Sequence, residues 1–223
     1  MSADNGLELI SFKVCPYVQR SVIALNLKGV DYKLTYVNPH EPPEWFKDVS
    51  PLGKVPVLVV NGRPVFESAV ILEYLDEVYE PRLHPADPLE KAVHRAWFEF
   101  CSDLLGRLFR LQTSKEESAF NEARDSLQQG LQRLETVLAA DEPFFAGAQF
   151  HLVDCVYAPL FMRLDLLNQH FGIAFTYNER VQTWREALLA MPAVQQSVAE
   201  DFETAFLNFL AGQNGFIQTY KKP

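Results

Sequence analysis

The sequence predicts an α/β domain followed by an all-helical domain, and three observations support this fold class. Residues 1–80 follow the order strand, helix, strand, loop, strand, strand, helix. From residue 89 onward the apolar spacing is helical throughout. Between these parts, residues 81–88 contain three prolines and no regular pattern. We therefore expect an N-terminal domain over 1–80, a linker over 81–88 and a helical domain over 89–223.

The N-terminal domain opens with a strand–helix–strand unit. Apolar, β-rich runs cover residues 7–12 and 32–37. An amphipathic helix is expected between them from Pro16 to Lys28, and Gly29 supplies its left-handed C-cap. A unit of this kind places its two strands parallel, with a right-handed crossover.

The second half of this domain reads as a hairpin followed by a helix. Residues 54–60 and 63–66 flank Asn61-Gly62, which is the strongest short signal for a two-residue hairpin turn. Pro56 lies inside the first strand pattern, so it is expected at a strand start or after a cis bond. Ser68 lies where the next helix begins.

Glycine and proline residues divide the second domain into helices. The expected helices cover about residues 89–113, 117–140, 151–170, 178–190 and 192–210. The last two are separated by Met191-Pro192, and the tail over 212–223 is expected to be loosely held.

Composition excludes several classes of partner. The 223 residues include 20 Lys and Arg against 29 Asp and Glu, and the net charge is −9. No basic patch is available for nucleic acid or an anionic membrane, and no apolar run approaches the length of a membrane span.

The three cysteines are widely spaced and the five histidines show no ligand spacing, so we expect no disulfides and no metal. A polar N-terminus without a signal peptide completes the prediction of a cytoplasmic protein.

Cys15-Pro16 is the candidate reactive site. Pro16 suits the first position of a helix, so Cys15 stands directly before the first turn. Unpaired N–H groups and the positive end of the helix dipole there favour a thiolate. Val18 occupies the position where a second motif cysteine would stand, so the thiol needs an external partner. Cys101 and Cys155 lie inside helical patterns and are expected to be small buried residues.

Four stretches together resemble the glutathione transferases. A strand–helix–strand domain with an N-terminal Cys-Pro junction resembles the thioredoxin fold, and the all-helical remainder extends the resemblance over essentially the whole chain. The sequence is most similar to the cysteine-type classes, which are the omega, lambda and dehydroascorbate-reductase classes. The stretches are residues 15–20, 43–46, 54–58 and 67–76.

The resemblance implies a glutathione site. Val55 would present its backbone N–H and C=O to the cysteinyl part, with Pro56 in the cis form. Ser68 would take the γ-glutamyl carboxylate and Glu67 the ammonium group. Lys54 would meet the glycyl carboxylate, and the ligand thiol would lie against the motif cysteine.

Two positions depart from the family pattern. Omega-type sequences often carry a lysine before Pro-Glu-Trp, where this chain has Pro42. The sixth helix usually begins with Ser or Thr, where this chain has His151, although Asp154 can still reach back to the N-cap N–H.

A second-substrate pocket is also implied, facing the motif cysteine. Its expected lining residues are Phe12, Tyr17, Phe109, Arg110 and Trp184. Lys13 and Arg20 are expected at the solvated surface by default, and the alternative is that they add positive potential near Cys15.

These expectations define a glutathione-dependent transferase and thiol-disulfide oxidoreductase. Its Cys15 thiolate would form a mixed disulfide with glutathione, with thioltransferase or dehydroascorbate reductase activity on a small electrophilic or disulfide substrate. The resemblance implies a homodimer. The alternative is a non-catalytic glutathione- or ligand-binding module of the same fold, and a glutathionyl-hydroquinone reductase is a third reading.

Overall fold

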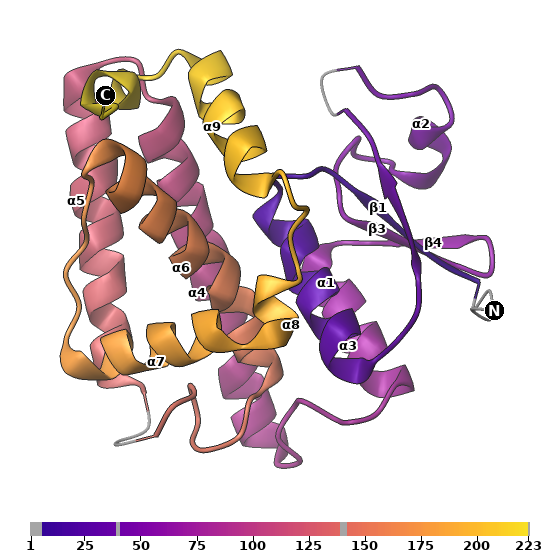
Figure 1. The fold of residues 1–223 in the computed structure, drawn as a ribbon. Coiled ribbons are helices and arrows are strands. Elements are labelled where there is room, and N and C mark those ends of the chain that lie inside the picture. Colours follow the sequence, from indigo (N-terminus) through magenta and orange to yellow (C-terminus); the bar gives the residue numbers. More distant parts are fainter. Residues whose placement is uncertain (1–5, 39–40, 139–141, 223) are drawn as a thin grey trace.

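A computed structural model describes residues 6–38, 41–138 and 142–222 of the chain. Figure 1 shows a sheet with its helices next to an assembly of helices, which confirms a thioredoxin-like N-terminal domain followed by an all-helical domain. The elements of the first domain are β1 (Leu7–Ser11), α1 (Pro16–Lys28), β2 (Lys33–Tyr36), α2 (Phe46–Val49), β3 (Val57–Val60), β4 (Arg63–Phe66) and α3 (Ser68–Val78).

The four strands form one mixed sheet in the order β2-β1-β3-β4. β1 pairs parallel with β2, as the predicted strand–helix–strand unit requires, and antiparallel with β3. β3 and β4 form the predicted hairpin, in which Asn61 has φ 49° and Gly62 has φ 81°. Two successive residues with positive φ are what a type I′ turn needs.

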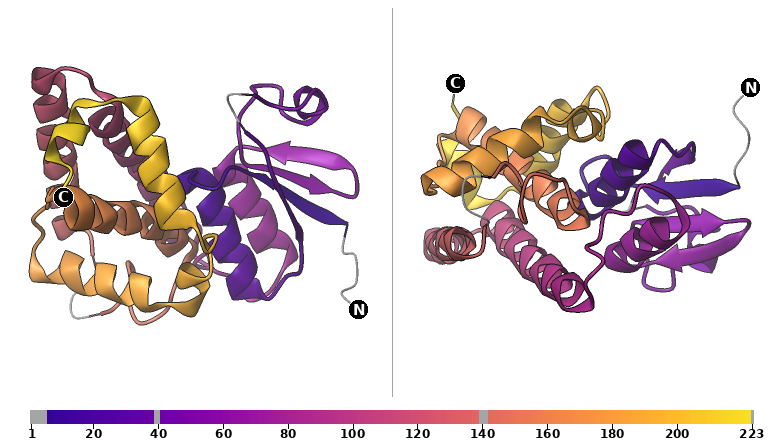
Figure 2. Two further views of the ribbon diagram at one scale, coloured as in Figure 1. Left: turned by 45° about the horizontal axis from the view of Figure 1, so that its top comes forward. Right: turned by 90° about the horizontal axis from the view of Figure 1, so that it is seen from below.

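Helices α1 and α3 pack together on the face of the sheet that is turned toward the second domain (Figure 2). Their apolar side chains, including Ile23, Ile71 and Leu75, are fully buried against the sheet residues Leu9 and Leu58. α1 therefore joins the two domains, because its other side packs on a helix of the second domain.

The helical domain differs from the sequence prediction at two places. The predicted helix over 192–210 is two helices, and the predicted helix over 117–140 ends at Arg133 with a 3₁₀ turn after it; residues 139 and 140 lie outside the described residues. The elements are α4 (Pro88–Thr113), α5 (Glu117–Arg133), η1 (Leu134–Thr136), α6 (Leu152–Phe171), α7 (Glu179–Ala190), α8 (Pro192–Gln195), α9 (Phe202–Gln213) and η2 (Phe216–Tyr220).

The break between α8 and α9 has a tertiary cause. The hydroxyl of Ser197 donates to the Val194 carbonyl and accepts a hydrogen bond from Gln19 of α1. A serine bonded to a nearby carbonyl competes with helical hydrogen bonding, so the chain turns here. This turn brings α9 beside the start of α1.

The tail is held more tightly than the sequence predicted. η2 lies within it, and Ile217 of η2 is fully buried. The rings of Phe216 and Tyr220 lie 5.4 and 5.2 Å from the ring of Phe120 in α5. Packing of these apolar side chains stabilises a segment whose local sequence has no strong helix propensity.

Candidate functional site

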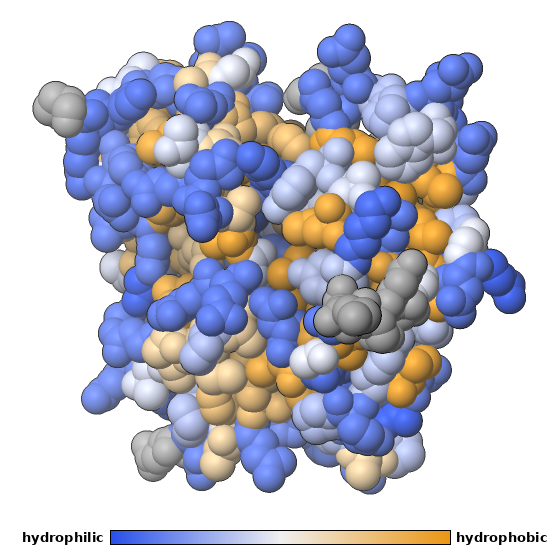
Figure 3. Space-filling model, turned by 45° about the vertical axis from the view of Figure 1, so that its right-hand side comes forward, coloured by the Kyte–Doolittle hydropathy of each residue, from blue (hydrophilic) through white to orange (hydrophobic). Residues whose placement is uncertain are grey.

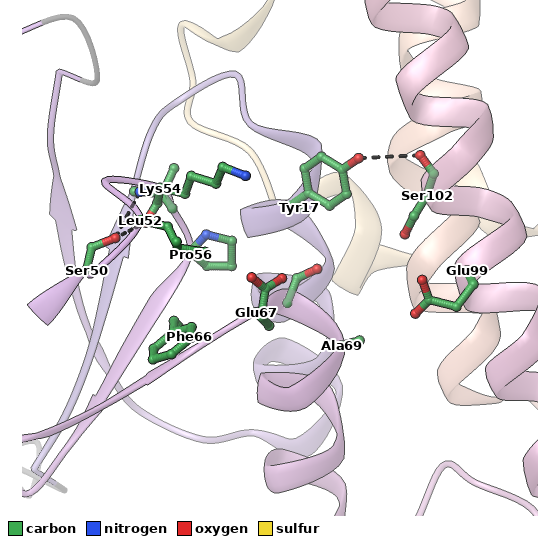
Figure 4. A pocket seen from close by; sticks show the side chains of 12 residues that line it. Tyr17, Ser50, Leu52, Lys54, Pro56, Phe66, Glu67, Ala69, Glu99 and Ser102 are labelled. Carbon is green, nitrogen blue, oxygen red and sulfur yellow. Dashed lines mark hydrogen bonds between the residues drawn. The ribbon is translucent and has the colours of Figure 1, made fainter.

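A cleft of about 420 Å³ lies between the sheet domain and α4 (Figure 4). The five residues that the resemblance assigned to glutathione all line it: Lys54, Val55, Pro56, Glu67 and Ser68. Two residues of α4, Glu99 and Ser102, stand on the opposite wall. Residues from separate stretches of the sequence therefore meet at one cavity.

The first wall is the segment that leads into β3. The Val55–Pro56 peptide bond is cis, as the family resemblance implied. Ser50 holds the segment in place, since its hydroxyl donates to the Lys54 carbonyl at 2.7 Å and accepts from the Lys54 N–H at 2.8 Å. The Lys54 side chain extends from this segment toward the cleft (Figure 4).

The second wall is the start of α3. Glu67 precedes the helix with φ 71° and ψ 117°, a conformation that costs energy for any residue other than glycine. The first turn of α3 contains no acidic side chain. Its N–H groups and the positive end of its dipole, together with buried Ser68, form a place suited to an anion.

Cys15 is the N-cap of α1. It is not among the residues that line the cleft, but it contacts Val55, which does line it, and it also lines a small separate pocket beside Phe12. It is half-buried, and its thiol lies 3.9 Å from the carbonyl oxygen of Val55. Burial raises the pKa of the Cys15 thiol, and the N–H groups of Val18 and Tyr17 oppose this shift. The N–H groups at the start of α1 therefore favour the thiolate as predicted, but burial, which the sequence did not reveal, outweighs them and the net direction of the pKa is upward.

Two buried arginines, Arg163 and Arg20, also lower the pKa of Cys15 by their positive charge, and the sequence analysis did not consider Arg163 for the site. Arg163 of α6 is 2% exposed and donates to the carbonyl of Val14, next to the cysteine, at 2.9 Å. Burial lowers the pKa of Arg163 to about 10. Arg20 of α1 is 1% exposed, so the expectation that it lies at the solvated surface is wrong.

A sequence signal existed for Arg163, because it interrupts a long apolar run in α6. A single cation at an otherwise buried helical position must find partners inside the protein. Nothing local distinguishes Arg20 from a surface arginine. Lys13 does lie at the surface, where it forms an exposed ion pair with Asp201 at 2.7 Å.

The predicted second-substrate residues do not come together. Tyr17 lines the cleft, and Phe12 lies beside Cys15 with its ring 6.4 Å from the ring of Phe209 in α9. Phe109 and Arg110 are exposed on α4 outside the cleft lining. Trp184 is fully buried, and its indole N–H donates to Asp154 at 2.7 Å, so its assignment to a substrate pocket is wrong.

Cys101 and Cys155 are free and fully buried, as predicted. Among the described residues, no group of three or more His, Cys, Asp or Glu side chains is placed to hold a metal ion. Within the same part of the chain, no helix combines the length and the apolar character that crossing a membrane requires.

Comparisons with known proteins agree with this architecture. Residues 14–78 match the family description "Glutathione S-transferase, N-terminal domain", and residues 117–194 match "Glutathione S-transferase, C-terminal domain". The chain is 32% identical over 211 residues to glutathione S-transferase omega-1 of Sus scrofa, an alignment that covers 93% of this chain and 87% of the relative.

Solved structures show the same similarity. Glutathione transferase Omega 3C from Trametes versicolor superimposes with a TM-score of 0.77 at 29% identity, over 89% of this chain and 91% of that one. Rice GST1, solved in complex with glutathione, superimposes with a TM-score of 0.80 at 26% identity, over 94% of this chain and 100% of that one. The similarity therefore extends over both domains.

Proposed function

Because the chain belongs to the glutathione S-transferase family, we propose that it is a glutathione-dependent thiol transferase in which Cys15 forms a mixed disulfide with glutathione. The observation that carries this proposal is the position of the Cys15 thiol beside the Val55 carbonyl. Val55 is the residue that would pair with the cysteinyl part of glutathione, so the ligand thiol would lie against Cys15.

The other cleft residues would hold the rest of the ligand. Ser68 and the N-terminus of α3 would bind the γ-glutamyl carboxylate, and Glu67 would bind the ammonium group. Lys54 would pair with the glycyl carboxylate. Similarity to the rice protein, which was solved with glutathione, supports the choice of ligand.

The reaction consists of two thiol–disulfide exchanges. The Cys15 thiolate attacks the glutathione sulfur of a mixed disulfide, breaks its S–S bond and releases the other thiolate. A second glutathione thiolate then attacks the glutathione sulfur on Cys15, which forms oxidised glutathione and returns the Cys15 thiolate. This cycle needs no second motif cysteine, which agrees with Val18 at that position. The reduction of dehydroascorbate by two glutathione molecules is the related activity we propose for the same thiol.

Conjugation by a hydroxyl group is less well supported. Tyr17 is the hydroxyl residue of the cleft nearest in sequence to Cys15, and it already donates to the Ser102 carbonyl at 3.4 Å. Burial raises the pKa of Tyr17, which disfavours the phenolate form.

The free cysteines of the chain suit a reducing compartment, and we propose the cytoplasm.

Adduct formation with oxidised glutathione tests the proposal and its pH dependence. Mass spectrometry is expected to find a glutathionyl adduct on Cys15, with the buried Cys101 and Cys155 unmodified as internal controls. The reactive form is the thiolate, and burial raises the pKa of Cys15, so the rate should still be rising at pH ~9. If the rate of adduct formation levelled off below pH ~8, the pKa of Cys15 would not be raised, and burial would not be the dominant influence on it.

The absence of any adduct, combined with calorimetric binding of glutathione, would favour the alternative of a binding module without turnover. No binding at millimolar glutathione would contradict the enzyme proposal and favour a module that binds another ligand.

We also propose a homodimer formed by the sheet domain and the start of α4. Of the eleven large apolar side chains exposed among the described residues, nine lie between Leu34 and Val93. Figure 3 shows apolar side chains at the surface of this domain among hydrophilic ones. Burial of such side chains is what stabilises a homodimer interface.

Light scattering is expected to give the mass of two chains. Changing Val70 or Leu89, which are 51% and 70% exposed, to aspartate should shift the protein toward the mass of one chain. Phe109→Asp is the matched control, because Phe109 is also exposed but lies outside this surface. Dissociation by the control alone would place the interface elsewhere.

A further inference from the structure

Arg163 of α6 is a buried cation that bonds to neutral groups. Its Nη2 donates to the Val14 carbonyl at 2.9 Å, and its Nη1 donates to the Pro159 carbonyl and to the Gln19 side chain, both at 2.7 Å. Among the described residues, no ion pair includes Arg163. A buried charge that only neutral acceptors hold is incompletely compensated, and it costs stability unless an opposite charge lies near.

The neighbouring group that can carry this opposite charge is the Cys15 thiol. Val14 directly precedes Cys15, Gln19 lies one turn further along α1, and α6 packs on α1 where the two domains meet (Figure 1). Burial raises the pKa of Cys15, and the charge of Arg163 opposes this shift. Burial lowers the pKa of Arg163, and a Cys15 thiolate opposes that shift in turn. Each group therefore stabilises the charged form of the other.

Other titratable side chains lie around Cys15 on the loop before α1, on α1, on β2 and at the start of α9: Lys13, Tyr17, Arg20, Tyr36 and Asp201. Burial raises the pKa values of both tyrosines, so their hydroxyls stay neutral near pH ~7. Lys13 and Asp201 compensate each other in an exposed ion pair. Arg20 and Arg163 are then the cations that remain for the thiolate.

Arg20 differs from Arg163 in what its guanidinium contacts. Its Nη1 donates to the hydroxyls of Ser68 and Ser102, and its guanidinium carbon lies 4.8 Å from the centre of the Tyr17 ring. These partners belong to α3, α4 and α1, whereas the Val14 carbonyl that Arg163 holds belongs to the loop that ends at Cys15. Arg163 is therefore the cation that is bonded to the Cys15 loop itself.

We infer that Arg163 is a positioning residue for Cys15: it fixes the loop before α1 through Val14 and supplies positive charge that stabilises the buried thiolate. The N–H groups at the start of α1 offset the effect of burial only in part. A fixed positive charge acts strongly in an interior of low dielectric, so Arg163 adds to these donors. The inference rests on the proposed function, because it takes the Cys15 thiolate as the nucleophile.

Alkylation by iodoacetamide, followed by mass spectrometry of the peptide that contains Cys15, measures the thiolate without glutathione. Arg163→Gln removes the charge and can still donate a hydrogen bond to Val14. It should slow the alkylation of Cys15 at least about tenfold at pH ~7.5, as expected if the pKa of the thiol rises by about 1. The difference should narrow as the pH rises, because the thiolate then forms in both proteins. A merely structural role would change the rate by one factor at every pH.

Two further variants separate charge from packing. Arg163→Lys keeps the charge without the planar fork, so at pH ~7.5 it should slow alkylation much less than Arg163→Gln does. Arg185→Gln is the matched control, because it removes a cation of α7 that forms an ion pair with Asp165 of α6. Its alkylation rates should equal those of the original protein at every pH.

The outcomes distinguish this inference from the proposed function. If iodoacetamide does not modify Cys15 in the original protein even at pH ~9, the thiol is no nucleophile and both fail. If Cys15 reacts but Arg163→Gln keeps the pH dependence of the original protein, this inference alone is overturned. The same holds if Arg185→Gln slows alkylation as much as Arg163→Gln. Should Arg163→Gln not fold, a tenfold loss of rate at pH ~7.5 in Arg163→Lys, which keeps the charge, would overturn the inference.

Discussion

Replacing Cys15 by serine is expected to lower thioltransferase activity by at least about a thousand-fold, since serine cannot form the mixed disulfide and its hydroxyl is a poor nucleophile at neutral pH. The measurement is kcat/KM with a glutathionyl mixed disulfide as substrate. The residues that line the cleft are not changed by this substitution, so glutathione binding should persist. Loss of turnover with retained binding would separate the role of the thiol from that of the cleft.

Cys101→Ser is the matched control for this experiment. The Cys101 thiol is fully buried and donates to the Val156 carbonyl at 3.2 Å, a hydrogen bond that a serine hydroxyl also makes. Its activity should stay close to that of the original protein. Full thioltransferase activity in Cys15→Ser would rule out the Cys15 mechanism. Conjugating activity, which other transferases obtain from a Tyr or Ser hydroxyl, is expected to be weak in the original protein, and serine at this position could raise it.

Local patterns predicted the parts of the site that depend on a few neighbouring residues. The Cys15-Pro16 junction and the Asn61-Gly62 turn lie where the sequence placed them, because each is determined by backbone preferences of the residues themselves. The lining positions of Val55 and Ser68 were implied by the family resemblance and not by local patterns. These motifs predicted where in the sequence the residues of the site stand.

Burial was the property that local patterns did not predict. Arg20 and Trp184 are in the interior because elements distant in sequence pack over them, and neither residue type indicates that by itself. Burial also reversed the expected direction of the Cys15 pKa shift. The sequence showed that Cys15 precedes a helix, but it did not show that tertiary packing buries the thiol. The turn between α8 and α9 depends likewise on a hydrogen bond to α1.

Asp154→Ala is expected to lower the free energy of unfolding by about 3–5 kcal/mol, the largest stability effect that the described structure implies. Asp154 is fully buried at the start of α6. Its Oδ2 accepts from the His151 N–H at 2.8 Å, as the capping pattern predicted, and its Oδ1 accepts from the Phe145 N–H at 3.1 Å and the Trp184 indole N–H at 2.7 Å. Alanine would leave all three donors without this acceptor.

The pH dependence of the same residue has a definite sign. Burial raises the pKa of Asp154 to about 6, above its ordinary value of 3.8, so the folded protein binds this proton more tightly than the unfolded chain does. The stabilisation that Asp154 contributes through its raised pKa is full below pH ~4 and is lost as pH rises through about 6. Denaturant unfolding at pH ~5 and pH ~7.5 should therefore show a larger effect of Asp154→Ala at the lower pH.

Asp165→Ala is the matched control, because Asp165 lies on the same helix but its side chain is 37% exposed in its ion pair with Arg185. Such a surface pair contributes at most about 1 kcal/mol, so this variant should unfold close to the original protein. A loss below about 1 kcal/mol for Asp154→Ala would mean that water or neighbouring groups satisfy the three donors. The Asp154 carboxylate would then be a replaceable cap, and the contact between α6 and Trp184 of α7 would depend on packing alone.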